Sequence, residues 1–276
     1  MKGLIIKAIS GEYTVKTEDK IIVCKPLGIF RHRNISPKVG DHVVVENNTI
    51  VDIEDRITDL IRPSVSNVDK VFIITSLTEP ELNLNLLDRL ISVIEWMNIE
   101  IVLIYTKIDL IDIDHFANII NYYKGLGYNS YIMPGDIDKI INEVNDHICV
   151  VAGQSGVGKS SMINKIDSNF NIKTDIISKA LGRGKHTTRH TELLEVGTGY
   201  IADTPGFGTL DFEMDVVSLS HSFKEFFNTK CKFNKCLHLK EPGCMVKEKV
   251  EKNIIMKSRY ENYLLFVNEI NSKKKY

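Results

Sequence analysis

The sequence predicts an α/β fold in which a parallel β-sheet, with helices on both faces, lies between a small N-terminal β-barrel and a C-terminal helical domain. Three observations lead to this prediction. Short β-branched runs broken by turns fill residues 1–65, apolar strands alternate with helical segments over residues 66–215, and residues 216–276 combine a cysteine and histidine cluster with a basic helical stretch. Regular alternation of strands and helices is typical of a parallel sheet covered on both sides.

The composition fits a protein with more than one small core, because 43% of the 276 residues are hydrophobic. No apolar run approaches the roughly 20 residues that a membrane-spanning helix needs, and residues 1–10 lack the apolar stretch of a signal peptide. The five cysteines show no evident pairing, which suits a reducing compartment. We therefore expect a cytoplasmic protein that contacts no membrane, and a monomer by default.

Charge is distributed unevenly along the chain although the net charge is only -1. Lys and Arg number 10 against 9 Asp and Glu in residues 1–65, 12 against 21 in residues 66–215, and 13 against 6 in residues 216–276. The basic C-terminal region favours a polyanionic partner, and a solvated lysine-rich helix explains it about as well.

Five strands are expected in the first domain, at residues 4–9, 13–16, 21–24, 42–46 and 49–53. Five short strands in one small domain suggest an OB-like barrel. Arg31, His32 and Arg33 follow Phe30 between the third and fourth strands. Basic residues beside an aromatic ring suit contact with RNA, and a solvated loop is an equal alternative.

Strands and helices alternate through the middle domain. Strands are expected at residues 71–75, 101–105, 128–133 and 148–152, and helices at 84–97, 116–123, 137–144 and from 159 onward. Farther along, residues 216–227 form a short amphipathic segment, and residues 246–270 are expected to form a charged helical stretch.

A phosphate-binding loop follows the last of these strands and precedes a helix. It comprises Gly153, Gln154, Ser155, Gly156, Val157, Gly158, Lys159 and Ser160. Glycine is needed where backbone N–H groups converge on a phosphate and a Cβ would clash. Lys159 would reach the β- and γ-phosphates and assist catalysis, and the Ser160 hydroxyl would bind Mg²⁺. The alternative is a glycine-rich turn that binds no nucleotide.

Two further segments fit the same nucleotide. Asp203 ends a strand and would hold Mg²⁺ through water, while the N–H of Gly206 would meet the γ-phosphate. Residues 182–190 have the glycines and threonines of a mobile loop, in which Thr188 or Thr187 would bind Mg²⁺. Taken alone, these two segments are an ordinary turn and an exposed basic turn.

A guanine-reading motif precedes the phosphate loop in the chain. It comprises Thr106, Lys107, Ile108 and Asp109, after a buried strand. The Asp109 carboxylate can accept hydrogen bonds from guanine N1–H and the 2-amino group, which adenine does not offer. In ordinary GTPases the phosphate loop comes first and the base reader last. The order in this chain therefore indicates a circularly permuted P-loop GTPase domain, which is feasible because the ends of a compact domain are often close.

The C-terminal domain contains a candidate zinc site. Cys231, Cys236, His238 and Cys244 supply three thiolates and an imidazole, a ligand set that suits a closed, structural Zn²⁺ site. Free buried cysteines or an iron–sulfur cluster are the alternatives. A catalytic zinc is not expected, because four protein ligands leave no open position.

These motifs in this order resemble the RsgA (YjeQ) family of bacterial, small-subunit-dependent, circularly permuted GTPases, and the resemblance covers nearly the whole chain. It implies an OB domain (1–65), a permuted GTPase domain (66–215) and a zinc domain (216–276). It also implies that residues 153–161, including Ser161, bind the phosphates and residues 106–109 read guanine. Ribosomal RNA and proteins of the small subunit are the implied partners, and late maturation of that subunit is the implied function.

Some positions depart from the family pattern. Thr106 stands where Asn is usual, which is expected to loosen the loop contacts, and residues 134–136 are not a Ser-Ala pair. Phe207 occupies the place of a water-orienting glutamine, so unstimulated hydrolysis should be slow, and His186 is our candidate to compensate. A basic loop residue that touches rRNA is an equal reading of His186.

Three functions follow from these patterns, in decreasing order of support. The first is a GTPase that assembles the small (30S) ribosomal subunit and is stimulated by it. The second is an RNA-binding protein in which the GTPase is a regulatory clamp and hydrolysis is incidental. The third is a P-loop ATPase or kinase, which predicts ATP binding and tolerance of Asp109→Asn.

Overall fold

The N-terminal domain is a closed five-stranded barrel. The computed structural model describes residues 1–32, 35–61, 63–108, 113–170, 191–203 and 211–273. The barrel strands are β1 (Lys2–Ile9), β2 (Glu12–Thr17), β3 (Ile21–Pro26), β4 (His42–Glu46) and β5 (Thr49–Ile53). They lie in the order β1-β2-β3-β5-β4, and β1 also pairs with β4, which closes the barrel. The expected OB-like barrel is therefore confirmed.

Along the barrel strands, every second side chain points into the barrel core. Ile5, Val15, Val43 and Ile50 are fully buried there. A short helix, α1 (Ile29–His32), follows β3, and its Phe30 is only 4% exposed within the same core. The barrel core thus takes up the Phe30 ring, so the ring is not an exposed aromatic surface beside the basic residues. The side chains of Arg31 and His32, and the whole of Arg33, lie outside the described residues.

The middle domain is built on five parallel strands. These are β8 (Lys70–Ser76), β9 (Glu100–Thr106), β10 (Asn129–Ile132), β11 (Ile148–Ala152) and β13 (Gly199–Asp203), in the order β10-β9-β8-β11-β13. A sixth strand, β12 (Thr191–Val196), runs antiparallel to β13 at the edge. A two-residue pair, β6 (Asp59–Leu60) with β7 (Val65–Ser66), lies between the barrel and this sheet in the sequence.

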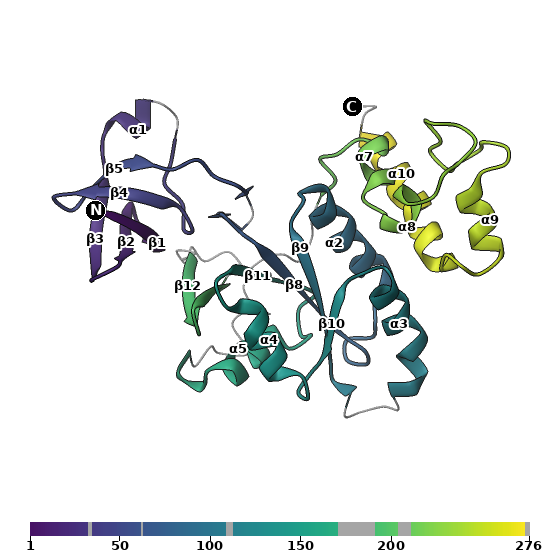
Figure 1. The fold of residues 1–276 in the computed structure, drawn as a ribbon, viewed down its shortest axis with the longest axis horizontal. Helices are drawn as coiled ribbons and strands as arrows, with labels where there is room; N and C mark the ends of the chain where they lie inside the picture. Colours follow the sequence, from purple (N-terminus) through teal and green to yellow (C-terminus); the bar gives the residue numbers. More distant parts are fainter. Residues whose placement is uncertain (33–34, 62, 109–112, 171–190, 204–210, 274–276) are drawn as a thin grey trace.

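Helices cover both faces of this sheet (Figure 1). On one face, α2 (Leu84–Trp96) and α3 (Ala117–Gly125) pack against alternate strand residues such as Val71 and Ile73. On the other, α4 (Ile137–Val144) and α5 (Lys159–Ile166) pack against the intervening Phe72 and Ile74. A single-turn 3₁₀ helix (Ile113–Phe116) precedes α3, and another (Ser168–Phe170) follows α5. The predicted α/β architecture is confirmed.

The C-terminal domain consists of four helices on the outer side of α2 (Figure 1). They are α7 (Val216–His221), α8 (Lys224–Phe227), α9 (Met245–Glu251) and α10 (Lys257–Lys273). Their core of Leu219, Phe223, Phe226, Tyr263 and Phe266 also includes Val93 of α2. Across the described part of the chain, no helix is long and apolar enough to cross a lipid bilayer.

The helix expected over residues 246–270 is divided in two. Asn253 takes a left-handed conformation (φ +56°), and the N–H groups of Ile254 and Ile255 both donate to the carbonyl of Lys249. This turn ends α9 and carries Ile255, which is only 2% exposed, into the domain core. Burial of Ile255 therefore decides the break, although no glycine or proline marks it.

Candidate functional site

The phosphate loop connects β11 to α5 at the carboxyl edge of the parallel strands. Gly153 has φ +141°, and a Cβ there would lie 2.2 Å from the carbonyl oxygen of Ile74. Gly158 has φ +99° and is the residue that precedes the first turn of α5. A side chain at position 153 would collide with the neighbouring strand, so the loop can approach β8 this closely only with glycine. The helix N-terminus behind it is suited to an anion.

Lys159 is folded into this loop. Its ammonium group donates to the carbonyl oxygens of Gly153 (2.8 Å) and Gln154 (2.6 Å). Burial, which removes water from the ammonium group, lowers the pKa of Lys159 to about 8. Ser160 is only 6% exposed in the first turn of α5, whereas Ser161 is exposed. The site thus holds a lysine whose charge a phosphate would stabilise.

The start of the base-reading motif lies against the phosphate loop. Thr106 ends β9, and its buried hydroxyl donates to the carbonyl oxygen of Val157 at 2.6 Å. Thr106 therefore joins the two loops directly. Ile108 is half-buried against the core of the sheet.

A turn that the sequence analysis did not single out supports Lys107. The Lys107 ammonium donates to the carbonyl oxygen of Glu79, and the Thr78 hydroxyl donates to the carbonyl oxygen of Lys107 at 3.3 Å. Ser76 shapes the turn, because its buried hydroxyl accepts from the N–H groups of Thr78 (3.2 Å) and Glu79 (3.0 Å). The sequence signal is a Ser-x-Thr after a buried strand, which is typical of a hydroxyl-stabilised turn.

Several expected site residues cannot be placed. Asp109, Gly206, Phe207, His186, Thr187 and Thr188 lie outside the described residues. Asp203 ends β13, beside the strand that enters the phosphate loop, but its side chain is also outside the described part. The structure therefore brings together residues 106–108 and 153–161, and the other assignments stay predictions.

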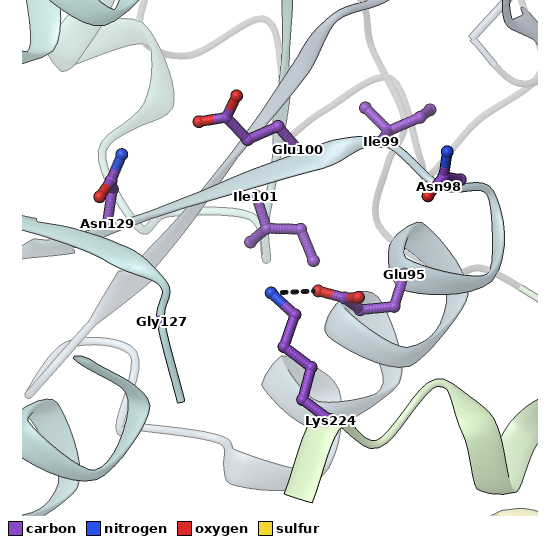
Figure 2. Close-up of a pocket in the computed structure, with 8 residues that line it drawn as sticks. All are labelled: Glu95, Asn98, Ile99, Glu100, Ile101, Gly127, Asn129 and Lys224. Atoms are coloured by element: carbon purple, nitrogen blue, oxygen red, sulfur yellow. Dashed lines mark ion pairs between the residues drawn. The ribbon is translucent and has the colours of Figure 1, made fainter. Parts of the chain in front are cut away.

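A cleft of about 320 Å³ lies at the opposite edge of the sheet, where β9 and β10 begin. Figure 2 shows Lys224 of α8 reaching Glu95 across it, at 2.9 Å between nitrogen and oxygen. Glu100 also has a lysine partner, Lys70, at 3.7 Å, and Asn129 donates to Glu143 at 2.9 Å. Because these polar groups are already paired and the phosphate loop is at the far edge, we do not assign the nucleotide to this cleft.

The C-terminal Cys and His side chains come together as one cluster. The ligand atoms of Cys231, Cys236, His238 and Cys244 all lie within 4.8 Å of one another. The Cys231 and Cys244 sulfurs are 3.9 Å apart, and the His238 Nδ1 lies 3.4 Å from the Cys244 sulfur. Tetrahedral zinc with Zn–S bonds of about 2.3 Å separates its sulfurs by roughly 3.8 Å, so the arrangement fits such an ion.

The loop around the cluster is held by the helices behind it. The Tyr260 hydroxyl donates to the carbonyl oxygen of His238 at 2.7 Å, and the Tyr263 hydroxyl donates to that of Leu237 at 2.6 Å. The Glu241 carboxylate accepts from the N–H of Leu237 at 2.8 Å. Burial lowers the pKa of His238, which keeps the imidazole neutral as a metal ligand must be. The cluster can therefore hold a metal ion.

Comparisons with known proteins agree with this architecture. A family model described as the RsgA GTPase matches residues 53–213, and one described as the RsgA N-terminal domain matches residues 2–50. The protein named small ribosomal subunit biogenesis GTPase RsgA of Halalkalibacterium halodurans is 44% identical, over 99% of this chain and 98% of its own length. Its namesake from Clostridium botulinum is 41% identical, over 98% of this chain and 97% of its own.

Two solved structures have the same fold. One is YloQ, described as a circularly permuted GTPase, with a TM-score of 0.84 and 36% identity over 99% of this chain and 95% of that chain. The other is YjeQ from Thermotoga maritima, with a TM-score of 0.82 and 32% identity over 98% of each chain. The permuted order read from the motifs is therefore confirmed at the level of the fold.

Proposed function

The chain belongs to the RsgA GTPase family, and from this premise we propose that it binds GTP with Mg²⁺, hydrolyses it to GDP and phosphate, and acts late in the maturation of the small ribosomal subunit. The observation that carries the proposal is the bond from the Thr106 hydroxyl to the Val157 carbonyl. Through this bond, a base-reading loop that comes early in the chain is joined to a phosphate loop that comes later.

Each loop would have a defined role in nucleotide binding. Residues 153–161 would hold the phosphates, Lys159 would neutralise the β- and γ-phosphates, and residues 106–109 would select guanine. Ser160 would bind Mg²⁺ together with Thr188 or Thr187, with Asp203 acting through water. When bound, Mg²⁺ would neutralise charge that develops on the phosphates. Gly206 would meet the γ-phosphate, and His186 is our candidate for orienting the attacking water.

The flanking domains would attach the GTPase to its partner. We propose that the barrel (1–65) contacts rRNA and that the C-terminal domain (216–276), with one structural zinc on Cys231, Cys236, His238 and Cys244, contacts rRNA or ribosomal proteins. The net positive charge of the C-terminal region supports the second assignment. A ribosome assembly factor of this kind would act in the cytoplasm, as a monomer.

Nucleotide turnover with different partners tests the proposal. GTP and ATP hydrolysis should be measured for the protein alone, with small subunits, with large subunits and with bulk RNA, all at one salt concentration because phosphate contacts are salt-dependent. We expect slow turnover alone, because Phe207 cannot orient water, and a many-fold increase with small subunits only. GTP turnover that is the same with and without ribosomal subunits would favour the RNA-clamp function. A preference for ATP would overturn the role of Asp109.

A substitution tests the catalytic assignment separately. His186→Ala should bind GTP normally and lose most of the stimulation by small subunits. If it hydrolyses GTP on the subunit at the unmodified rate, His186 does not orient the water.

A further inference from the structure

One arginine is completely buried where the C-terminal helices meet the GTPase domain. Arg259 of α10 has no exposed surface, and the side chains of its two acidic partners are 0% exposed (Asp88 of α2) and 6% exposed (Glu225 of α8). One guanidinium nitrogen donates to the Asp88 carboxylate at 2.8 Å, and two others donate to the Glu225 carboxylate at 2.8 and 3.1 Å. Helices α2, α8 and α10, which come from two domains, thus meet at one buried arginine and its two acidic partners.

The remaining polar atoms of this group are also paired. The Asp88 carboxylate accepts from the Tyr123 hydroxyl of α3 and from the Asn262 amide of α10, both at 2.6 Å. The Tyr122 hydroxyl donates to Glu225 at 3.2 Å, and the Arg259 guanidinium lies 4.3 Å from the centre of the Phe223 ring. We call Asp88, Tyr123, Glu225, Arg259 and Asn262 the buried charge cluster.

Because the charged side chains of this buried charge cluster are shielded from water, the helices that carry them can shift little relative to one another. Sliding α10 along α2 would leave Arg259 or Asp88 charged, buried and unpaired, which costs far more than breaking an exposed pair. A buried ion pair of this kind adds little net stability compared with a hydrophobic contact and is better suited to fixing one arrangement of two elements. Helices α2, α8 and α10 should therefore move as one body.

The N-terminal end of α2, directly before Asp88, lies at the nucleotide loops. Leu86 and Leu87 of its first turn line the same small gap as Gly153 and Gln154 of the phosphate loop. The turn of residues 76–80, which leads into α2, supports Lys107. Displacement of α2 would therefore act on the phosphate loop and on the base-reading motif together.

We propose that Arg259 is a positioning residue that couples the C-terminal domain to the nucleotide site through α2. Nucleotide binding then tightens the contact between α2 and α10, and contact of the C-terminal domain with the ribosomal subunit acts back on the loops by the same coupling. The first half of this inference rests only on nucleotide binding, and the second half rests on the whole of the proposed function.

Hydrogen exchange without ribosomes tests the first half. In the zinc-loaded protein, a non-hydrolysable GTP analogue should slow amide exchange at the phosphate loop and, by about tenfold, in α8 and α10. Arg259→Met should keep the response at the phosphate loop and lose it in α8 and α10. Lys257→Met, at an exposed position of the same helix, is the matched control and should respond like the unmodified protein.

Three outcomes would overturn the inference. The first is no response in α8 and α10 of the unmodified protein, and the second is the same response in Arg259→Met. If Arg259→Met loses its zinc, Arg259→Lys replaces it, since lysine keeps the charge and loses the two-point contact with Glu225. An unmodified response in Arg259→Lys is the third contradicting outcome.

Stimulated turnover then tests the second half. Arg259→Met should still bind small subunits, and without subunits it should hydrolyse GTP at the unmodified rate. The stimulation of its turnover by small subunits should be about tenfold smaller than in the unmodified protein. If the unmodified protein is not stimulated by subunits, the proposed function fails while the exchange result still decides the coupling.

Discussion

At the scale of single residues, the Thr106 hydroxyl offers a sharp test of how the permuted motifs meet. Thr106→Val keeps the shape of the side chain and leaves the buried Val157 carbonyl without its 2.6 Å donor. An unmet buried hydrogen bond costs about 1–3 kcal/mol, so affinity for GTP and GDP should fall about tenfold. Equilibrium titration with a fluorescent guanine nucleotide measures this, and Thr106→Ser, which keeps the donor, is the control. Unchanged affinity in Thr106→Val would mean that the bond does not hold the loops for binding.

Lys159 makes a second prediction at this scale, on pH. In the nucleotide-free protein its pKa is about 8, and phosphates bind the charged form, so the pKa must be higher in the complex. Affinity is therefore full below about pH 8 and falls as pH rises above it, by up to about tenfold per pH unit. Nucleotide titrations from about pH 7.5 to 9 measure this. Lys159→Arg stays charged throughout and should show a flatter profile; an equally steep profile would assign the titration to another group.

At the scale of elements, we expect the loop between α8 and α9 to depend on the metal ion that its Cys and His side chains can hold. With zinc bound, thiol reagents should react slowly with all five cysteines. After chelation, Cys231, Cys236 and Cys244 should react and the melting temperature of the C-terminal domain should fall, since structural zinc contributes folding free energy. Cys24 and Cys149 are 1% and 0% exposed and should stay unreactive.

Two variants separate the metal from general thiol effects. Cys236→Ser should lose the zinc, as measured by metal analysis of the purified protein, while Cys24→Ala should keep one zinc per chain. Full zinc occupancy in Cys236→Ser would remove Cys236 from the ligand set. GTP affinity should change little in Cys24→Ala, because Cys24 lies in β3, outside the nucleotide loops.

The elements that could be predicted from the sequence are those with a clear local pattern. The expected helix at 137–144 and strand at 148–152 agree with the observed α4 and β11, since their apolar periods are unambiguous. Strand β12 was missed because its Glu192 and Glu195 interrupt the apolar pattern and because one of its two partners, β1, is distant in sequence. Secondary structure that depends on remote partners leaves little local signal.

In the candidate site, too, the residues that could be predicted from the sequence are those in a clear local pattern. The glycine spacing identified a loop whose φ angles require glycine, and the Cys/His spacing identified four side chains that do converge. The turn of residues 76–80 was missed because its importance lies in a contact with Lys107, which no local pattern encodes. The roles of Asp109, Gly206 and His186 stay predictions, since these residues lie outside the described part of the chain.

At the scale of the whole molecule, the GTPase domain, which carries the nucleotide loops, is joined to the barrel by strand pairing and to the C-terminal domain by helix packing. Strand β12 pairs with β1, so the barrel and the GTPase domain share one eleven-stranded sheet. Ion pairs from Lys7 to Glu192 (2.7 Å) and from Lys16 to Glu195 (2.6 Å) reinforce this junction at its exposed side. On the other side, α2 carries the C-terminal helices (Figure 1). A change at the nucleotide can therefore reach the barrel through β12 and the C-terminal domain through α2.

The charge distribution gives the last prediction at this scale. If the C-terminal domain contacts rRNA phosphates, Lys232→Gln with Lys235→Gln, both exposed, should weaken binding to small subunits and reduce the steepness of its salt dependence. Each lost phosphate contact lowers the slope of log K against log salt by about 0.7–0.9. Lys124→Gln with Lys165→Gln removes the same charge from exposed positions of the acidic GTPase domain and should leave the slope unchanged. Equal slopes in both double variants would mean that net charge, and not local phosphate contact, governs binding, because a long-range field acts on all four lysines alike.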